Sequence, residues 1–189
     1  MARALPFLVA AALFAYPFAV YFGLRHWGLG GIAPVLLGLF ALRFFTTRGG
    51  LAFSVARLFS IAGAALVALS WIFRQNEWML YYPVAVSLLL LSGFVWSLFK
   101  PPTAIERLAR LKDPDLPPEG VRYTRRVTQV WCAFFIFNGS ISLATCLHGD
   151  LAIWTFYNGA LSYILIALLF SGEWLLRRRL TGKPKDKQP

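Results

Sequence analysis

Apolar stretches long enough to cross a lipid bilayer recur along the chain, and they restrict its fold more than any other feature. A helix crosses about 30 Å of hydrocarbon with about 20 residues. The chain is 58% hydrophobic and only 14% charged, whereas soluble domains carry about 25% charged residues. This composition excludes a soluble globular domain, a disordered chain and a small disulfide scaffold. We predict an all-α polytopic membrane protein, a bundle of about six transmembrane helices at residues 5–24, 29–45, 51–73, 79–99, 128–147 and 151–176.

Basic residues mark one side of the predicted bundle. Of the 19 lysines and arginines, all but Arg25 and Arg74 fall at one set of helix ends. Because loops rich in Lys and Arg stay in the cytoplasm, we expect both termini on the cytoplasmic side, which requires an even number of spans. The net charge of +11 therefore indicates topology and attraction to the anionic lipids of the inner leaflet rather than binding of nucleic acid.

The longest polar connection predicts a short helix outside the bilayer. Thr103 and Glu106 form a capping-box pattern, and apolar residues follow at helical spacing, at Ile105, Leu108 and Leu111. We expect a cytoplasmic amphipathic helix on the inner leaflet between the fourth and fifth spans, followed by an extended loop at 113–120. The chain then divides into helices one to four at 1–99, the basic connection at 100–127, a helical hairpin at 128–176 and a basic cytoplasmic tail at 177–189.

The last two spans share a motif of the form aromatic-Asn-Gly-x-x-Ser. It occurs at residues 137–142 and again at 157–162, in helices of opposite direction. An amide in hydrocarbon must find a partner, so Asn138 and Asn158, with Ser142 and Ser162, are candidate site residues. They either join the hairpin through interhelical hydrogen bonds, each contributing about 0.6–2 kcal/mol, or bind the polar group of a lipid or substrate.

Charged residues gather where the same hairpin meets the cytoplasm. Glu173 and Arg177 have the i, i+4 spacing of a helical ion pair. Alternatively, Glu173 meets Arg125 or Arg126 across the hairpin and shapes a site for a head group. The surrounding basic rim is explained by topology and anionic lipid, or by docking of an acidic cytosolic partner.

Signals for catalysis or metal binding are weak. His148 and Asp150 flank a glycine in a tight turn, and the sequence contains no Gly-rich phosphate loop, His-Glu-x-x-His or Gly-x-Ser-x-Gly pattern. Cys132 and Cys146 lie on one predicted helix, about 21 Å apart, too far for a disulfide. We expect no catalytic residue, no metal and no cofactor.

A family resemblance appears in the last third of the chain. The segment from Gly120 to Cys132, the two Asn-Gly motifs and Gly172-Glu173-Trp174 resemble a group of small bacterial inner-membrane proteins. Genes for that group lie among fatty-acid-synthase-like genes, including those for aryl-polyene (xanthomonadin-type) pigment lipids. The resemblance implies the bacterial inner (plasma) membrane, and a role in export, anchoring or assembly of a polyene or acyl lipid. It also makes an acidic acyl carrier protein a natural partner for the basic rim.

These observations favour one function and leave two alternatives. The favoured hypothesis is a non-enzymatic membrane component of a lipid or polyene biosynthesis pathway, which binds or translocates an acyl or polyene lipid intermediate. The first alternative is a membrane-embedded acyl or glycosyl transferase, although the few acids on the inner side weigh against it. The second is a small-molecule transporter, for which a proton-coupled mechanism requires an acid near the bilayer centre.

Overall fold

The computed structural model describes residues 15–46, 51–75, 77–111 and 113–181, with the side chains of 51–55 and 176–181 outside the described set. This part of the chain is helical and contains no strand. Its elements are α2 (Tyr16–His26), α3 (Gly28–Thr46), α4 (Leu51–Phe73), α5 (Glu77–Leu80), α6 (Tyr82–Phe99), α7 (Ala104–Arg110), α8 (Pro118–His148), α9 (Leu151–Phe156), the π-helical turn η1 (Tyr157–Leu161) and α10 (Ser162–Thr181).

Five helical segments of the described chain are long and apolar enough to cross a membrane. They are Gly28–Thr46, Ala56–Phe73, Tyr82–Phe99, Pro118–His148 and Leu151–Leu175. They match the second to sixth predicted spans, so the predicted all-helical membrane fold is confirmed at this level. Of the first predicted span, at 5–24, only the part within α2 is described, and the rest lies outside the described residues, as does most of the predicted tail.

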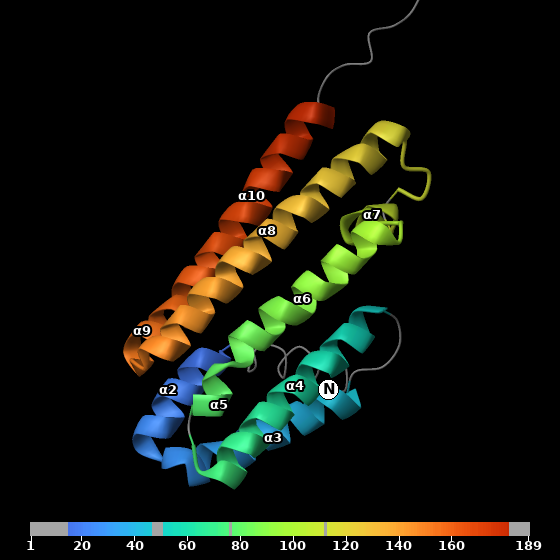
Figure 1. Cartoon of the computed structure of the whole chain (residues 1–189). Coiled ribbons are helices and arrows are strands. Elements are labelled where there is room, and N and C mark those ends of the chain that lie inside the picture. Colours follow the sequence, from blue (N-terminus) through green and yellow to red (C-terminus); the bar gives the residue numbers. More distant parts are fainter. Residues whose placement is uncertain (1–14, 47–50, 76, 112, 182–189) are drawn as a thin grey trace, which may run out of the picture.

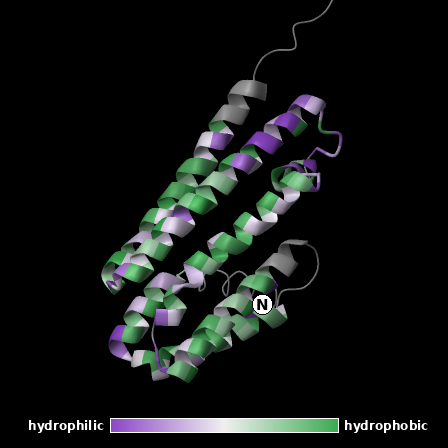
Figure 2. Cartoon of the chain, in the orientation of Figure 1, coloured by the Kyte–Doolittle hydropathy of each residue, from purple (hydrophilic) through white to green (hydrophobic). Residues whose placement is uncertain are grey.

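The helices run between two ends of an elongated bundle (Figure 1). At one end α7 lies beside the start of α8 and the end of α10; we call it the α7 end. The other end contains the end of α2, the short helix α5 and the start of α9; we call it the α9 end. Apolar residues colour most of the helix surfaces, whereas hydrophilic residues concentrate around α7 and the first turns of α8 (Figure 2).

Two clusters of buried side chains hold the bundle together. Near the α9 end, Tyr16, Phe40 and Trp154 are buried among residues of α2, α3, α5 and α9. The ring of Tyr16 packs against Tyr82 with 4.6 Å between ring centroids. Nearer the α7 end, Trp131 and other side chains of α8 pack with α6, α7 and α10. The candidate site lies between these clusters, along the first half of α6.

The fourth predicted span, at 79–99, is interrupted near its start. The structure ends α5 at Leu80 and begins α6 at Tyr82. Proline has no N–H, so Pro83 cannot donate to the carbonyl of Met79 four residues earlier. That carbonyl instead accepts a hydrogen bond from Tyr16 Oη at 2.9 Å.

The next carbonyl at this break is also satisfied by side chains. Leu80 O accepts from Trp154 Nε1 at 3.0 Å and from Cys146 Sγ at 3.2 Å. Together with Tyr16, these donors come from three other parts of the bundle, α2, α8 and α9. Backbone groups freed inside a membrane protein need such internal partners, because lipid supplies none.

The connection at 100–127 contains the helix that the sequence predicts. Thr103 caps α7 in a capping box with Glu106, and Glu106 also pairs with Arg110 at 2.9 Å. Ile105 is buried against α8, whereas Leu108 is 61% and Leu111 83% exposed. The predicted apolar stripe is therefore split, since one residue packs on the protein and two face outward.

The predicted loop at 113–120 was wrong in its last three residues. The structure begins α8 at Pro118, so this helix runs across the predicted boundary at residue 127. Proline is favourable in the first turn of a helix, where its missing N–H has no intrahelical partner to lose. With 31 residues, α8 is about 46 Å long, and its first turns extend beyond a hydrocarbon layer of about 30 Å.

Candidate functional site

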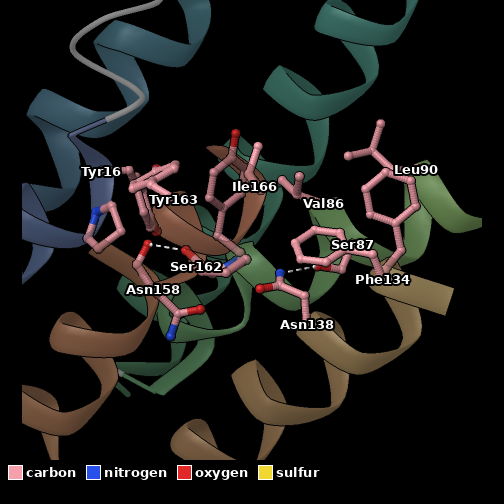
Figure 3. Close-up of a pocket in the computed structure, with 14 residues that line it drawn as sticks. Tyr16, Val86, Ser87, Leu90, Phe134, Asn138, Asn158, Ser162, Tyr163 and Ile166 are labelled. Carbon is pink, nitrogen blue, oxygen red and sulfur yellow. Dashed lines mark hydrogen bonds between the residues drawn. The ribbon is translucent and has the colours of Figure 1, made fainter. Parts of the chain in front are cut away.

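A small cavity lies inside the bundle between α2, α6, α8 and the segment formed by η1 and α10 (Figure 3). Its volume is about 120 Å³. Its lining combines aromatic and aliphatic side chains with a few hydroxyls and amides: Tyr16, Pro17, Tyr82, Pro83, Val86, Ser87, Leu90, Phe134, Phe135, Asn138, Asn158, Ser162, Tyr163 and Ile166. Three predicted site residues, Asn138, Asn158 and Ser162, therefore line one cavity.

Asn138 links three segments of the bundle from its place on α8. Its Nδ2 donates to Ser87 Oγ of α6 at 3.2 Å, and its Oδ1 accepts from Tyr157 Oη at 3.1 Å. The side chain is buried. Both ends of the amide are thus occupied by protein partners.

Asn158 occupies the second copy of the motif and bonds to the facing helix. Its Oδ1 accepts from Ser142 Oγ at 2.8 Å, and its Nδ2 donates to Thr145 Oγ1 at 3.2 Å and to Trp154 O at 2.9 Å. Ser142 is fully buried beside it. The two asparagines do not bond to each other, and each instead joins its own set of hydroxyls.

The second copy of the motif lies in a π-helical turn, Tyr157–Leu161. Such a turn shifts the backbone pairing from i−4 to i−5 and widens the helix, and π-bulges are frequent at functional sites. Here side chains supply extra donors to carbonyls in the turn and just before it, since Asn158 Nδ2 bonds Trp154 O of α9 and Ser162 Oγ bonds Asn158 O at 3.1 Å. The turn directs Asn158, Ser162 and Tyr163 toward the cavity (Figure 3).

The glycines of the two motifs permit close packing, but not against each other. A Cβ on Gly139 would lie 3.1 Å from the Cβ of Ser87 in α6, and one on Gly159 would lie 2.9 Å from the ring of Phe18 in α2. The motif therefore brings α6 and α2 close to the hairpin.

The four remaining residues proposed from sequence lie near the α7 end, away from the cavity. Arg125 donates to Leu98 O, at the end of α6, at 3.1 Å. Arg126 is exposed, and Glu173 is half-buried, with its carbonyl accepting from Tyr123 Oη at 3.4 Å. The side chain of Arg177 is outside the described residues. The structure thus separates these residues from Asn138 and Asn158.

The exposed face of α8 locates the cavity relative to a membrane. This face is polar at Arg122, Arg126 and Gln129, and from Val130 to Leu147 its exposed residues are apolar except for Ser140. That apolar part spans 18 residues, about 27 Å, close to the hydrocarbon thickness of about 30 Å. Asn138 lies about 12 Å from its start, so the cavity lies at the middle of the apolar layer.

The turn between α8 and α9 is formed by a left-handed glycine and a helix cap. Gly149 ends α8 with a φ of 78°, and Asp150 caps α9 by accepting from the backbone N–H groups of Ala152 and Ile153. The N–H groups of Ile153 and Ala152 lower the pKa of the Asp150 carboxyl below its usual value. This agrees with the prediction of a tight turn at His148-Gly149-Asp150.

Sequence reasoning missed three partners in the polar network. Ser87 is one of three serines in its apolar span, and Thr145 follows the first motif without being part of it. Tyr157 could have been predicted from the sequence, because it is the aromatic residue of the second copy of the motif. It is 5% exposed and bonds Asn138, whereas its counterpart Phe137 is 53% exposed. The sequence signal was that the aromatic residue of the second copy carries a hydroxyl, whereas that of the first copy does not.

A scan of the chain against protein-family models, a search of curated proteins and a search of solved structures each gave no match.

Proposed function

We propose that this chain is a non-enzymatic integral membrane protein that binds the hydrocarbon chain of a lipid intermediate in the cavity between α6, α8 and α10. The lipid is an acyl or polyene intermediate of a biosynthesis pathway, and the membrane is a bacterial inner membrane. The resemblance of the last third of the chain supports the choice of pathway and membrane.

The observation that carries the proposal is that the asparagines and serines lining the cavity are already hydrogen-bonded to protein groups. Among the described residues, no buried side-chain nitrogen or oxygen lacks a hydrogen-bond partner. Asn138, Asn158 and Ser162 therefore offer little to a polar solute, because binding one would first break protein bonds. The remaining lining is mostly aromatic and aliphatic, and apolar surface gains free energy by covering a hydrocarbon chain.

The distribution of basic residues supports an orientation with the α7 end in the cytoplasm. Arg122, Arg125 and Arg126 lie there with α7, and Lys100 lies over the ring of Trp96 at 4.5 Å. Positive residues stay on the cytoplasmic side of inner-membrane proteins. With this orientation the amphipathic α7 lies against the inner leaflet, and the basic surface faces an acidic acyl carrier protein by charge complementarity.

Photocrosslinking tests the proposal directly. The full chain is purified into lipid nanodiscs that contain a phospholipid with a diazirine in the middle of one acyl chain. After irradiation, mass spectrometry identifies the labelled residues. We expect labelling of α6, α8 and α10 at the cavity lining, above the general labelling of lipid-facing residues.

A pair of variants on one helix separates the cavity from the lipid-facing surface. Val86→Phe fills the cavity, whereas Leu88→Phe makes a similar change at an exposed residue of α6. Labelling of the cavity should fall strongly in Val86→Phe and stay unchanged in Leu88→Phe. Equal labelling of both variants would refute a chain-binding cavity.

The pathway is tested in cells that lack the gene. Loss of one acyl or polyene lipid, with its finished precursor kept at the inner membrane, supports binding or transfer. A precursor that lacks one chemical group instead indicates an enzyme. An unchanged lipid profile contradicts the pathway while leaving the crosslinking result to stand by itself.

A further inference from the structure

A second, wider pocket opens at the α9 end of the bundle. It has a volume of about 500 Å³ and lies between the end of α2, α5 and the turn that leads into α9. These three elements lie together at one end of the molecule (Figure 1). The lining is Tyr21, Leu24, Arg25, Glu77, Leu80, Gly149, Asp150, Leu151 and Ala152. The pocket shares no lining residue with the cavity.

Charged side chains are scarce at this end, yet most of them line this pocket. Apart from histidines, the charged residues described here are Arg25, Arg74, Glu77 and Asp150. All except Arg74 line the pocket. The guanidinium of Arg25 in α2 and the carboxylates of Glu77 in α5 and Asp150 in the α8–α9 turn therefore line the same pocket.

These charges are not paired with one another. Within the described part of the chain, the structure shows no ion pair between Arg25 and either Glu77 or Asp150. Arg25 donates to Tyr21 Oη at 2.7 Å with one of its five N–H groups. Both bonds that Asp150 accepts at the start of α9 use Oδ1. The pocket thus holds separated charges of both signs, next to the apolar side chains of Leu24, Leu80 and Leu151.

We propose that this pocket binds a phosphoethanolamine group, with the phosphate at Arg25 and the primary ammonium at Glu77 and Asp150. A guanidinium recognises phosphate oxygens with several N–H donors, and carboxylates accept the ammonium protons. A head group at the end of a transmembrane bundle is the nearest source of this chemistry, and the leucines at the pocket then contact the first methylenes of a phospholipid. Free phosphoethanolamine presents the same two charges.

The carboxylates predict a preference among zwitterions. A primary ammonium offers three N–H donors, whereas the trimethylammonium of choline offers none. Choline binding instead uses cages of several aromatic rings, and Tyr21 is the aromatic residue of this lining. We therefore expect phosphatidylethanolamine to bind about tenfold more tightly than phosphatidylcholine, a difference typical of charge-assisted hydrogen bonds.

The test measures lipid binding to the purified full chain in detergent by native mass spectrometry. Short-chain phosphatidylethanolamine is titrated against phosphatidylcholine with the same chains. Arg25→Gln and Glu77→Gln should each weaken phosphatidylethanolamine binding about tenfold and leave phosphatidylcholine binding unchanged. Asp150→Asn removes the charge but keeps a good helix cap, so its effect reports the charge alone.

Arg74→Gln is the matched control, because it removes an arginine at the same end but outside the pocket. Displacement of the lipid by free phosphoethanolamine would support the site and show that the head group suffices. Binding of the lipid without such displacement would support the site and show that the chains are needed. Equal affinity for the two lipids, or equal effects of Arg74→Gln and Arg25→Gln, would overturn the proposal. Photolabelling of the cavity is read separately, so failure of either proposal leaves the other tested.

Discussion

Replacing Tyr16 by phenylalanine should destabilise the bundle through a single backbone carbonyl. The ring stays, so its packing against Phe40 and Tyr82 is kept. The hydroxyl that donates to Met79 O at 2.9 Å is lost. Tyr16 is 1% exposed, and water does not replace the donor. An unsatisfied buried acceptor costs about 1–3 kcal/mol, and we expect a loss of unfolding free energy in this range.

The cause can be isolated with a second substitution at the break. Met79 O needs Tyr16 because Pro83 has no N–H to donate. In Pro83→Ala the backbone N–H of residue 83 is restored and lies four residues beyond Met79. In that background Tyr16→Phe should cost less than about 0.5 kcal/mol, since the carbonyl has regained a helical partner.

Reversible unfolding in mixed micelles with increasing SDS, followed by tryptophan fluorescence, measures the four free energies of this cycle. The expected coupling between the two positions is about 1–2 kcal/mol. Tyr81→Phe, which removes a tyrosine hydroxyl from the break itself, serves as a control and should change little. Strictly additive effects of Tyr16→Phe and Pro83→Ala would refute the explanation of the helix break.

Three further predictions concern the polar network, α7 and the α8–α9 turn. Asn158→Leu removes three hydrogen bonds and should lower the free energy of unfolding by about 2 kcal/mol, measured in the same SDS titration. Thr103→Ala removes the cap of α7 and should weaken that helix by about 1 kcal/mol, seen as faster amide hydrogen exchange at 104–110. The lowered pKa of Asp150 means that its cap stabilises the fold above the usual Asp pKa and that this contribution disappears as pH falls through the lower folded value. Asp150→Asn should abolish that pH dependence, measured by thermal unfolding between pH 2 and about 6.

The membrane fold was accessible from sequence because the apolar runs and the capping signals act locally. The box at Thr103 and Glu106 involves residues three apart, and the structure contains it. The start of α8 was missed because a proline such as Pro118 is compatible both with a loop and with the first turn of a helix. Proline disfavours helix for the residue before it, yet it is favoured in the first turn of a helix. A local pattern does not choose between them.

The candidate site was only partly accessible, because its partners lie far apart in the chain. Asn138 and Asn158 were identified since an amide in a span needs a partner. Ser87 lies 51 residues from Asn138, and a single sequence contains no information on such a pairing. A contact of Glu173 with Arg125 or Arg126 was one of two alternatives from the sequence, and the bond that Arg125 donates to Leu98 O at the end of α6 was not foreseen. The π-helical turn at Tyr157 depends on hydrogen bonds to α8 that become visible only in three dimensions.

Polar side chains at the middle of an apolar layer serve either passage of a polar solute or packing, and the two uses differ in what the hydrogen bonds do. A polar pathway needs donors and acceptors that a solute can take over. Here Asn138 and Asn158 bond Ser87, Tyr157, Ser142 and Thr145. These bonds fix α6, α8 and the widened turn of η1 around a cavity whose remaining lining is mostly aromatic and aliphatic. The motif copies thus frame the cavity, and under the proposed function selectivity would come from the shape of its aromatic lining. Asparagines that bond to other protein groups at the middle of the apolar layer are thus compatible with the apolar ligand that we propose.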